Sequence, residues 1–139
     1  MSGGEVADVL ARLEALRLAE KEQALLYRGI AALAERAEQP DLAQRFHDLH
    51  ADEQHHLSRL TVRILELGGR PADLSHVRVE PGSTSDWEGT IRTRETAEID
   101  RYRHELESSH DEATRALLLE IVGIEEHHSR ELGGKWTMA

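Results

Sequence analysis

Apolar residues recur at alternating intervals of three and four positions in four stretches of the chain, as in Val9, Leu13 and Leu16. This spacing places them on one face of an α-helix, and that face must then pack against other helices. The pattern predicts four helices, at about residues 5–37, 41–67, 86–108 and 111–132. The expected fold class is therefore all-α, with a single domain over residues 1–139.

Sequence signals at the ends of these stretches agree with the predicted helices. A serine followed three residues later by glutamate forms a capping box, in which each side chain satisfies a backbone N–H group at a helix start. Proline is tolerated in a first helical turn, and glycine often ends a helix because it readily takes the left-handed conformation. The predicted starts are Ser2/Glu5, Pro40, Ser85/Glu88 and Ser109/Glu112, and the predicted stops are Gly68-Gly69 and Gly133-Gly134.

The connections between the predicted helices differ in length. Those after the first and third helices are only a few residues long, so each of these helix pairs should form an antiparallel hairpin. The middle connection, residues 68–85, is long, and residues 70–84 alone could span about 50 Å, more than the roughly 40 Å length of the second helix. The sequence therefore predicts a four-helix bundle of two antiparallel hairpins joined by a long crossover.

Acidic residues and histidines occupy the middle of each apolar stripe. Burying an ionised carboxylate costs several kcal/mol unless something neutralises it. Five glutamates lie on these stripes, and four of them carry a charge of about −4, which two divalent cations would balance, while two neutral imidazoles would complete the ligand set. The residues are Glu20 in the first helix, Glu53 and His56 in the second, Glu95 and Glu98 in the third, and Glu125 and His128 in the fourth.

The two halves of the chain repeat the same order of polar residues. Glu20 precedes Tyr27 by seven positions, and Glu95 precedes Tyr102 by the same interval. Each half then has a Glu-x-x-His pair, whose members lie one helical turn apart on one face. Such a repeat is what a two-metal site with approximate two-fold symmetry requires.

Other polar residues near these motifs are interpreted as solvated. His55, Glu126 and His127 lie off the stripes, although they could matter near a path by which metal enters. A further pair, Glu107-x-x-His110, falls at the end of the third helix, where we interpret it as a chance spacing in a solvated turn.

Charge and composition exclude several classes of protein. The net charge of −10 disfavours a nucleic-acid partner, which needs a cationic face. The absence of cysteine excludes disulfides, thiolate zinc sites, iron–sulfur clusters and a cysteine nucleophile, so a metal must be held by oxygen and nitrogen. No apolar run is long enough to span a membrane and the N-terminus lacks a signal-peptide pattern, so a cytoplasmic location without a membrane partner is expected.

Several of these stretches resemble the rubrerythrin and bacterioferritin branches of the ferritin-like superfamily. They are Ala19-Glu20-Lys21-Glu22-Gln23-Ala24 through Tyr27, Asp52-Glu53-Gln54-His55-His56, Glu95-x-x-Glu98 and Glu125-Glu126-His127-His128. Of these, Glu95-x-x-Glu98 is similar to the paired glutamates of rubrerythrins. The resemblance covers about residues 10–132 and implies a ferritin-like bundle around two metal ions. It implies that Glu53 and Glu125 bridge the metals and that Glu20 and Glu95 are terminal carboxylates. His56 and His128 would be the terminal imidazoles. Glu98 would be either an extra ligand or the ligand from the third helix in place of Glu95.

The departures from those families also carry expectations. Without cysteine, the chain has no four-cysteine iron domain of the rubrerythrin kind, so an electron donor must be a separate molecule. Bacterioferritins place a haem-ligating methionine where this chain has Gln54, so no haem is expected. Only a short tail follows residue 132, where ferritin shells use a fifth helix, so a homo-oligomer is expected with a dimer favoured over a 24-subunit cage.

Three functions remain open from the sequence. The first is a di-iron oxidoreductase of the ferroxidase or peroxidase type, in which Glu53 and Glu125 are the catalytic residues and O2 or H2O2 oxidises Fe(II) or an external donor. The second is a protein that stores or carries iron, manganese or zinc without turnover. The third is a structural bundle whose metal site is vestigial.

Overall fold

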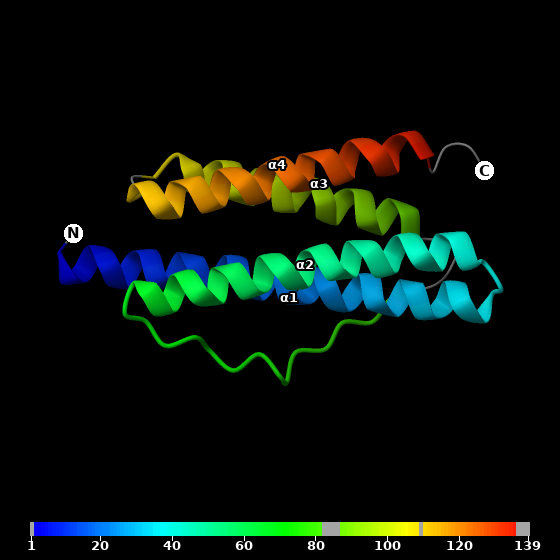
Figure 1. Cartoon of the computed structure of the whole chain (residues 1–139), viewed down its shortest axis with the longest axis horizontal. Helices are drawn as coiled ribbons and strands as arrows, with labels where there is room; N and C mark the ends of the chain where they lie inside the picture. The colour runs from blue at the N-terminus through cyan, green and yellow to red at the C-terminus, as the bar shows by residue number, and fades with distance from the viewer. Residues whose placement is uncertain (1, 82–86, 109, 136–139) are drawn as a thin grey trace. The chain divides into compact units, whose positions relative to one another are not determined.

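The computed structural model describes the backbone of residues 2–81, 87–108 and 110–135, and the side chains of these residues except Trp87 and 132–135. Within these ranges the chain forms α1 (Gly3–Arg36), α2 (Pro40–Glu66), α3 (Trp87–Leu106) and α4 (Glu112–Lys135), and no strand (Figure 1). The helix ends lie within three residues of the predicted ones. The chain forms two compact units, Met1–Thr84 and Ser85–Ala139.

Both ends of helix α1 are capped by hydrogen bonds to backbone groups that the helix itself leaves unpaired. At its start the Ser2 hydroxyl accepts a hydrogen bond from the backbone N–H of Glu5 at 3.1 Å, which confirms the predicted cap. At its end the N–H of Glu38 donates to the carbonyl of Glu35 and the N–H of Gln39 to that of Ala34. This is a Schellman motif, and it places Glu38 in the left-handed region with φ 57°.

Replacing Glu38 with glycine should stabilise the protein. A residue with a Cβ atom is strained in the left-handed conformation, whereas glycine adopts it without steric cost. Part of the gain is offset by the greater freedom of glycine in the unfolded chain, so we expect a net increase of about 0.5–1 kcal/mol in the free energy of unfolding. Urea denaturation measures this change, and a matched Glu35→Gly variant, placed in the right-handed last turn of α1, should instead lose stability.

The ends of the other helices show where glycine does and does not stop a helix. Helix α2 begins at Pro40, and Gly68 then ends it with φ 85°, while the N–H of Gly69 donates to the carbonyl of Ile64 at 2.9 Å. The stop predicted at Gly133-Gly134 is wrong, because α4 continues through both glycines to Lys135. Glycine permits a left-handed turn but also tolerates a right-handed helix, at a cost of about 1 kcal/mol relative to alanine. The caps predicted at Ser85 and Ser109 lie outside the described residues.

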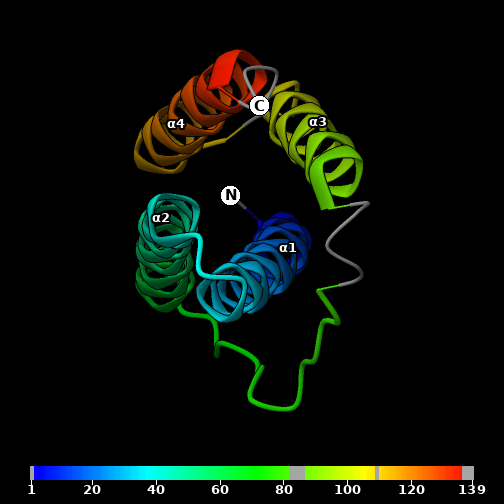
Figure 2. The same ribbon diagram turned by 90° about the vertical axis from the view of Figure 1, so that its right-hand side faces the viewer.

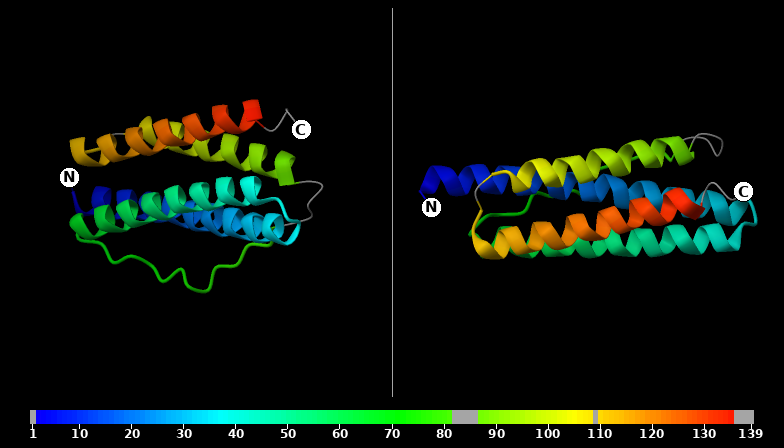
Figure 3. Two further views of the ribbon diagram at one scale, coloured as in Figure 1. Left: turned by 45° about the vertical axis from the view of Figure 1, so that its right-hand side comes forward. Right: turned by 90° about the horizontal axis from the view of Figure 1, so that it is seen from above.

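Helices α1 and α2 run antiparallel and pack along their predicted stripes (Figure 3). Every predicted stripe residue of α1 from Val9 to Ala34 is buried, and in α2 the stripe is buried from Phe46 to Ile64. Tyr27 and Phe46 are the largest side chains of this core, with ring centroids 5.8 Å apart. Helices α3 and α4 form the second antiparallel pair, with Ile91, Tyr102, Leu118 and Ile121 fully buried.

The segment that follows α2 runs back along the α1/α2 hairpin (Figure 1), and the end-on view shows that it lies outside α1 (Figure 2). Near its start, the Arg17 guanidinium donates to the carbonyl of Ala72 and to the Thr61 hydroxyl, both at 2.8 Å, while Glu14 accepts from the N–H of Ala72 at 2.7 Å. Near its end, Pro81 lies against Gly29, where a Cβ atom would come within 3.0 Å of the proline ring. The segment therefore follows α1 from the level of Glu14 to that of Gly29, as a crossover must.

No helix in the described ranges is long and apolar enough to cross a membrane. The apolar stretches of α1, α2, α3 and α4 are interrupted by charged residues, which give the bundle its polar faces.

Candidate metal centre

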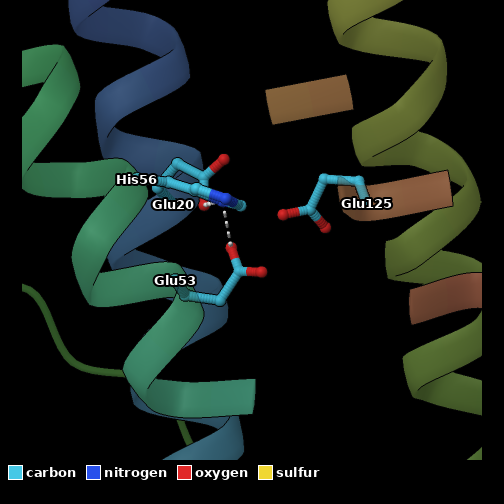
Figure 4. Close-up of side chains that lie close together, drawn as sticks. All are labelled: Glu20, Glu53, His56 and Glu125. Carbon is cyan, nitrogen blue, oxygen red and sulfur yellow. Dashed lines mark ion pairs between the residues drawn. The ribbon is translucent and has the colours of Figure 1, made fainter. Parts of the chain in front are cut away.

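Three potential metal ligands meet in the core of the first unit. Glu20 comes from the middle of α1, and Glu53 and His56 come from consecutive turns of α2, so that all three project into the same interior (Figure 4). Each offers a ligand atom, and these atoms lie within 4.8 Å of one another. His56 Nδ1 is 3.6 Å from a carboxylate oxygen of Glu20 and 4.0 Å from one of Glu53.

The burial of this trio is nearly complete. Glu20 and Glu53 have no exposed surface and His56 is 1% exposed. Two carboxyl groups carry a charge of −2 when ionised, whereas one imidazole contributes at most +1, so the ionised trio has a negative charge in a medium where an ion costs several kcal/mol. A divalent cation held by the carboxylate oxygens and the imidazole nitrogen would reverse this imbalance. The donor set therefore fits a metal such as iron, manganese or zinc.

The second unit carries a matching set of buried polar side chains. Glu95 and Glu98 lie one turn apart on α3 and are 1% and 5% exposed, and Glu125 and His128 lie one turn apart on α4 and are 0% and 4% exposed. Helix α4 thus repeats the Glu-x-x-His arrangement of α2, with apolar residues on the same stripe before it, at Leu118 and Ile121. Both candidate glutamates of α3 are buried.

The residues set aside as solvated mostly lie at the surface. His55 and His127 are exposed, and Glu126 accepts a hydrogen bond from Arg103 at 2.8 Å on the outside of the second hairpin. One of these interpretations is wrong. The His110 side chain is fully buried, and its Nε2 lies 3.1 Å from the carboxylate of Glu105, five positions earlier in the chain. Glu107, three positions earlier, is exposed.

Sequence reasoning also missed Gln23. Its side chain is 2% exposed, and its amide donates to the Tyr27 hydroxyl at 2.7 Å, in the same turn region as Glu20. The burial of Gln23 could have been predicted from its position, because it lies three residues after Glu20 and four before Tyr27 and so falls on the buried side of α1. Its hydrogen bond fixes the tyrosine in the core, next to the ligand-bearing part of the helix.

Comparison with known proteins accords with this geometry. A family model described as the ferritin-like domain matches residues 10–135. The chain belongs to the ferritin-like family. Among solved structures, the X-ray structure of bacterioferritin from Desulfovibrio desulfuricans is similar to this ferritin-like chain with a TM-score of 0.85 and 22% identity, covering 93% of this chain and 78% of that one. A comparison with curated proteins gives no match.

The structural likeness settles the fold of this ferritin-like chain. Its four helices and lack of strands in the described ranges, together with that TM-score, confirm the all-α four-helix bundle predicted from the apolar stripes. At 22% identity the likeness concerns the backbone, and the roles of individual side chains must be argued from the residues themselves.

One histidine of this ferritin-like chain should titrate unusually. Burial lowers the pKa of His50, and the nearby charges of Arg28, His47 and Lys21 lower it further. Because the unfolded chain binds a proton more readily at this position, the contribution of His50 to stability is complete above the ordinary histidine pKa and is lost as the pH falls below it. NMR titration should place the pKa of His50 below the ordinary value of 6.5, and a His50→Gln variant should lose stability less steeply on acidification than the parent chain.

Proposed function

We propose that this ferritin-like chain is a di-iron carboxylate protein that oxidises Fe(II) or an external electron donor with O2 or H2O2. The observation that carries the proposal is the trio of Glu20, Glu53 and His56, three donors with ligand atoms within 4.8 Å of one another in a fully buried setting. The second hairpin supplies its own buried carboxylates and a second Glu-x-x-His pair. We propose that these residues are metal ligands as well.

The proposed roles are those that the resemblance to rubrerythrins and bacterioferritins implies. By that resemblance Glu53 and Glu125, each of which precedes a histidine by one turn, would be the carboxylates shared by the two metal ions. Glu20 and Glu95 would each bind one metal ion, and His56 and His128 would do so through a ring nitrogen. Glu98, buried beside Glu95 on α3, would be an additional ligand or would replace it.

The chain's own residues prepare this site in two ways. The buried carboxylates concentrate negative charge, which attracts Fe(II) and supplies the oxygen donors that iron accepts together with imidazole nitrogen. The surrounding core, with Tyr27 held by Gln23, fixes the helices that carry those donors. When bound, a pair of iron ions would supply the electrons that reduce O2 or H2O2.

The similar bacterioferritin supports iron as the metal. Its structure is described as showing a di-iron site in different catalytic states, and this chain shares its fold over 93% of its length. Manganese and zinc accept the same ligands, so metal analysis must identify the native ion. The proposed partners are Fe(II), O2 or H2O2 and, for a peroxidase, a separate electron donor, and the chain is proposed to form a homo-oligomer, with a dimer favoured over a 24-subunit cage.

The direct test is to oxidise the iron-loaded protein. Two equivalents of Fe(II) per chain are added without air, and O2 or H2O2 is then mixed in while the near-ultraviolet absorbance of ferric iron is followed. We expect oxidation much faster than that of the same Fe(II) in buffer, with a burst that saturates near two iron ions per chain. Oxidation at the rate seen in buffer would overturn the proposal.

A second candidate function is iron storage or transport without turnover. The same buried donors would bind the metal, and the likeness to a bacterioferritin favours this alternative over a purely structural bundle. Gel filtration separates the two functions in part, because a large shell supports storage of mineral whereas a dimer supports an isolated enzyme. Tight binding of two metal ions with no oxidation above the buffer rate would identify a carrier.

A further inference from the structure

A cavity of about 510 Å³ lies between α1 and the segment that follows α2, entirely within the first unit. The segment lies outside α1 in this region (Figure 2). The volume is that of a site for a small organic molecule. One wall comes from a single face of α1 and the other from the extended segment, and the lining residues are Lys21, Leu25, Arg28, Gly29, Ala32, Ser75, Val77, Arg78 and Val79.

The cavity is basic in a protein that is otherwise strongly acidic. Three of its lining residues, Lys21, Arg28 and Arg78, are cationic, although the whole chain has a net charge of −10. In the described part of the chain, no carboxylate forms an ion pair with any of these three. Their charges are therefore available to an anion from outside.

One of the cations is held in place before any ligand arrives. The Arg78 guanidinium donates hydrogen bonds to the backbone carbonyls of Ser75 and Val77, both at 2.9 Å. Fixing a guanidinium in this way reduces the conformational entropy lost when it binds an anion. Lys21 and Arg28 stand two turns apart on α1, so that they face the same cavity from the opposite wall.

Apart from these cations, Gly29 and Ser75, the lining side chains are aliphatic. Leu25 and Ala32 lie on the face of α1, and Val77 and Val79 lie on either side of Arg78 in the segment, all of them half-buried. Such a surface gains free energy when it covers a hydrocarbon group, which a bare inorganic anion does not offer. The cavity thus combines a cationic group of side chains with an aliphatic wall.

We propose that this cavity binds a small amphipathic anion, a carboxylate with a short aliphatic chain. The carboxylate would lie among Lys21, Arg28 and Arg78, and the hydrocarbon chain would lie against Leu25, Val77 and Val79. The proposal is independent of the metal centre, since no lining residue is a candidate metal ligand.

The test titrates the whole protein with matched probes. Hexanoate should bind saturably with one molecule per chain in calorimetry, and it should shift the amide NMR resonances of Gly29 and Val77. Hexylamine, which has the same chain and the opposite charge, should not bind, and inorganic phosphate should bind more weakly. Absence of saturable hexanoate binding would overturn the proposal, and phosphate binding as tight as that of hexanoate would overturn the assignment of an aliphatic ligand.

Charge-removing variants test the residues. An Arg28→Gln/Arg78→Gln variant should weaken hexanoate binding by about ten-fold or more, because charge-assisted hydrogen bonds are lost. Arg36→Gln is the control, since Arg36 is an exposed arginine at the end of the same helix and does not line the cavity. Equal affinities in the double variant and the control would show that these arginines do not hold the anion. Neither substitution should change iron oxidation.

Discussion

Replacing Glu53 with alanine should lower the initial rate of Fe(II) oxidation by about a hundred-fold or more and remove at least one of the two bound metal ions. Glu53 is fully buried within the trio and is the residue that we assign to both metals. Loss of residues that merely support metal ligands costs about 10–100-fold in affinity or activity, so loss of a shared ligand should cost at least as much. Stopped-flow absorbance and metal analysis of the same sample measure the two effects.

Neighbouring residues provide matched controls for this prediction. Asp52 precedes Glu53 but is exposed, so Asp52→Ala should oxidise iron at the parental rate. His55 and His56 form a second matched pair, one exposed and one buried, and only His56→Ala should lose metal. Glu125→Ala should behave as Glu53→Ala does. Parental rates in both glutamate variants would remove the basis for catalysis at this site.

Replacing Glu53 with glutamine should stabilise the metal-free protein while destabilising the metal-loaded one. Without metal, Glu20 and Glu53 bring two buried carboxyl groups to one imidazole, with ligand atoms within 4.8 Å of one another, and two neighbouring carboxylates repel each other when both are ionised. Replacing one of them with the isosteric neutral amide should therefore gain about 1–3 kcal/mol. With metal, the same change removes a ligand, and binding to the native state can contribute about 2.7 kcal/mol at a hundred-fold excess over Kd. The effect of Glu53→Gln on the free energy of unfolding should therefore change sign when metal is bound.

Thermal unfolding with and without a chelator measures this reversal. For a chain of this size, 1 kcal/mol corresponds to a Tm change of about 2–8 °C, so the expected shifts are measurable. His55→Gln, on the exposed side of the same turn, should change Tm little in either condition. A Glu53→Gln variant that is less stable than the parent even without metal would indicate that Glu53 serves the fold rather than a metal ion.

The helices and the buried site residues could be predicted because they obey the same periodic rule. A stripe that is apolar at Leu16 and Ala24 fixes the face on which Glu20 must lie, and the same holds for Glu53 between Leu49 and Leu60. Periodicity says nothing of contacts between distant segments. The hydrogen bond from Arg17 to Ala72 joins residues 55 positions apart, and only the length of the connection indicated that such a route was possible.

Local conformation was predictable only where residue type determines it. Gly68 adopts the left-handed conformation expected of it, but Glu38 adopts the same conformation without being glycine, because the backbone hydrogen bonds at the end of α1 require it. The burial of His110 escaped prediction for a related reason. A helical spacing identifies residues on one face, whereas the partner of His110 depends on how the turn between α3 and α4 folds back onto Glu105.

The metal content of the purified protein is the most direct test of a two-metal site in this chain. The chain is expressed in iron-rich medium, purified without chelator and subjected to elemental mass spectrometry with the protein concentration measured in the same sample. We expect two metal ions per chain, predominantly iron, falling to one or none in Glu53→Ala and remaining at two in Asp52→Ala. A parent chain that carries no stoichiometric metal, or a Glu53→Ala variant that retains two ions, would contradict this expectation.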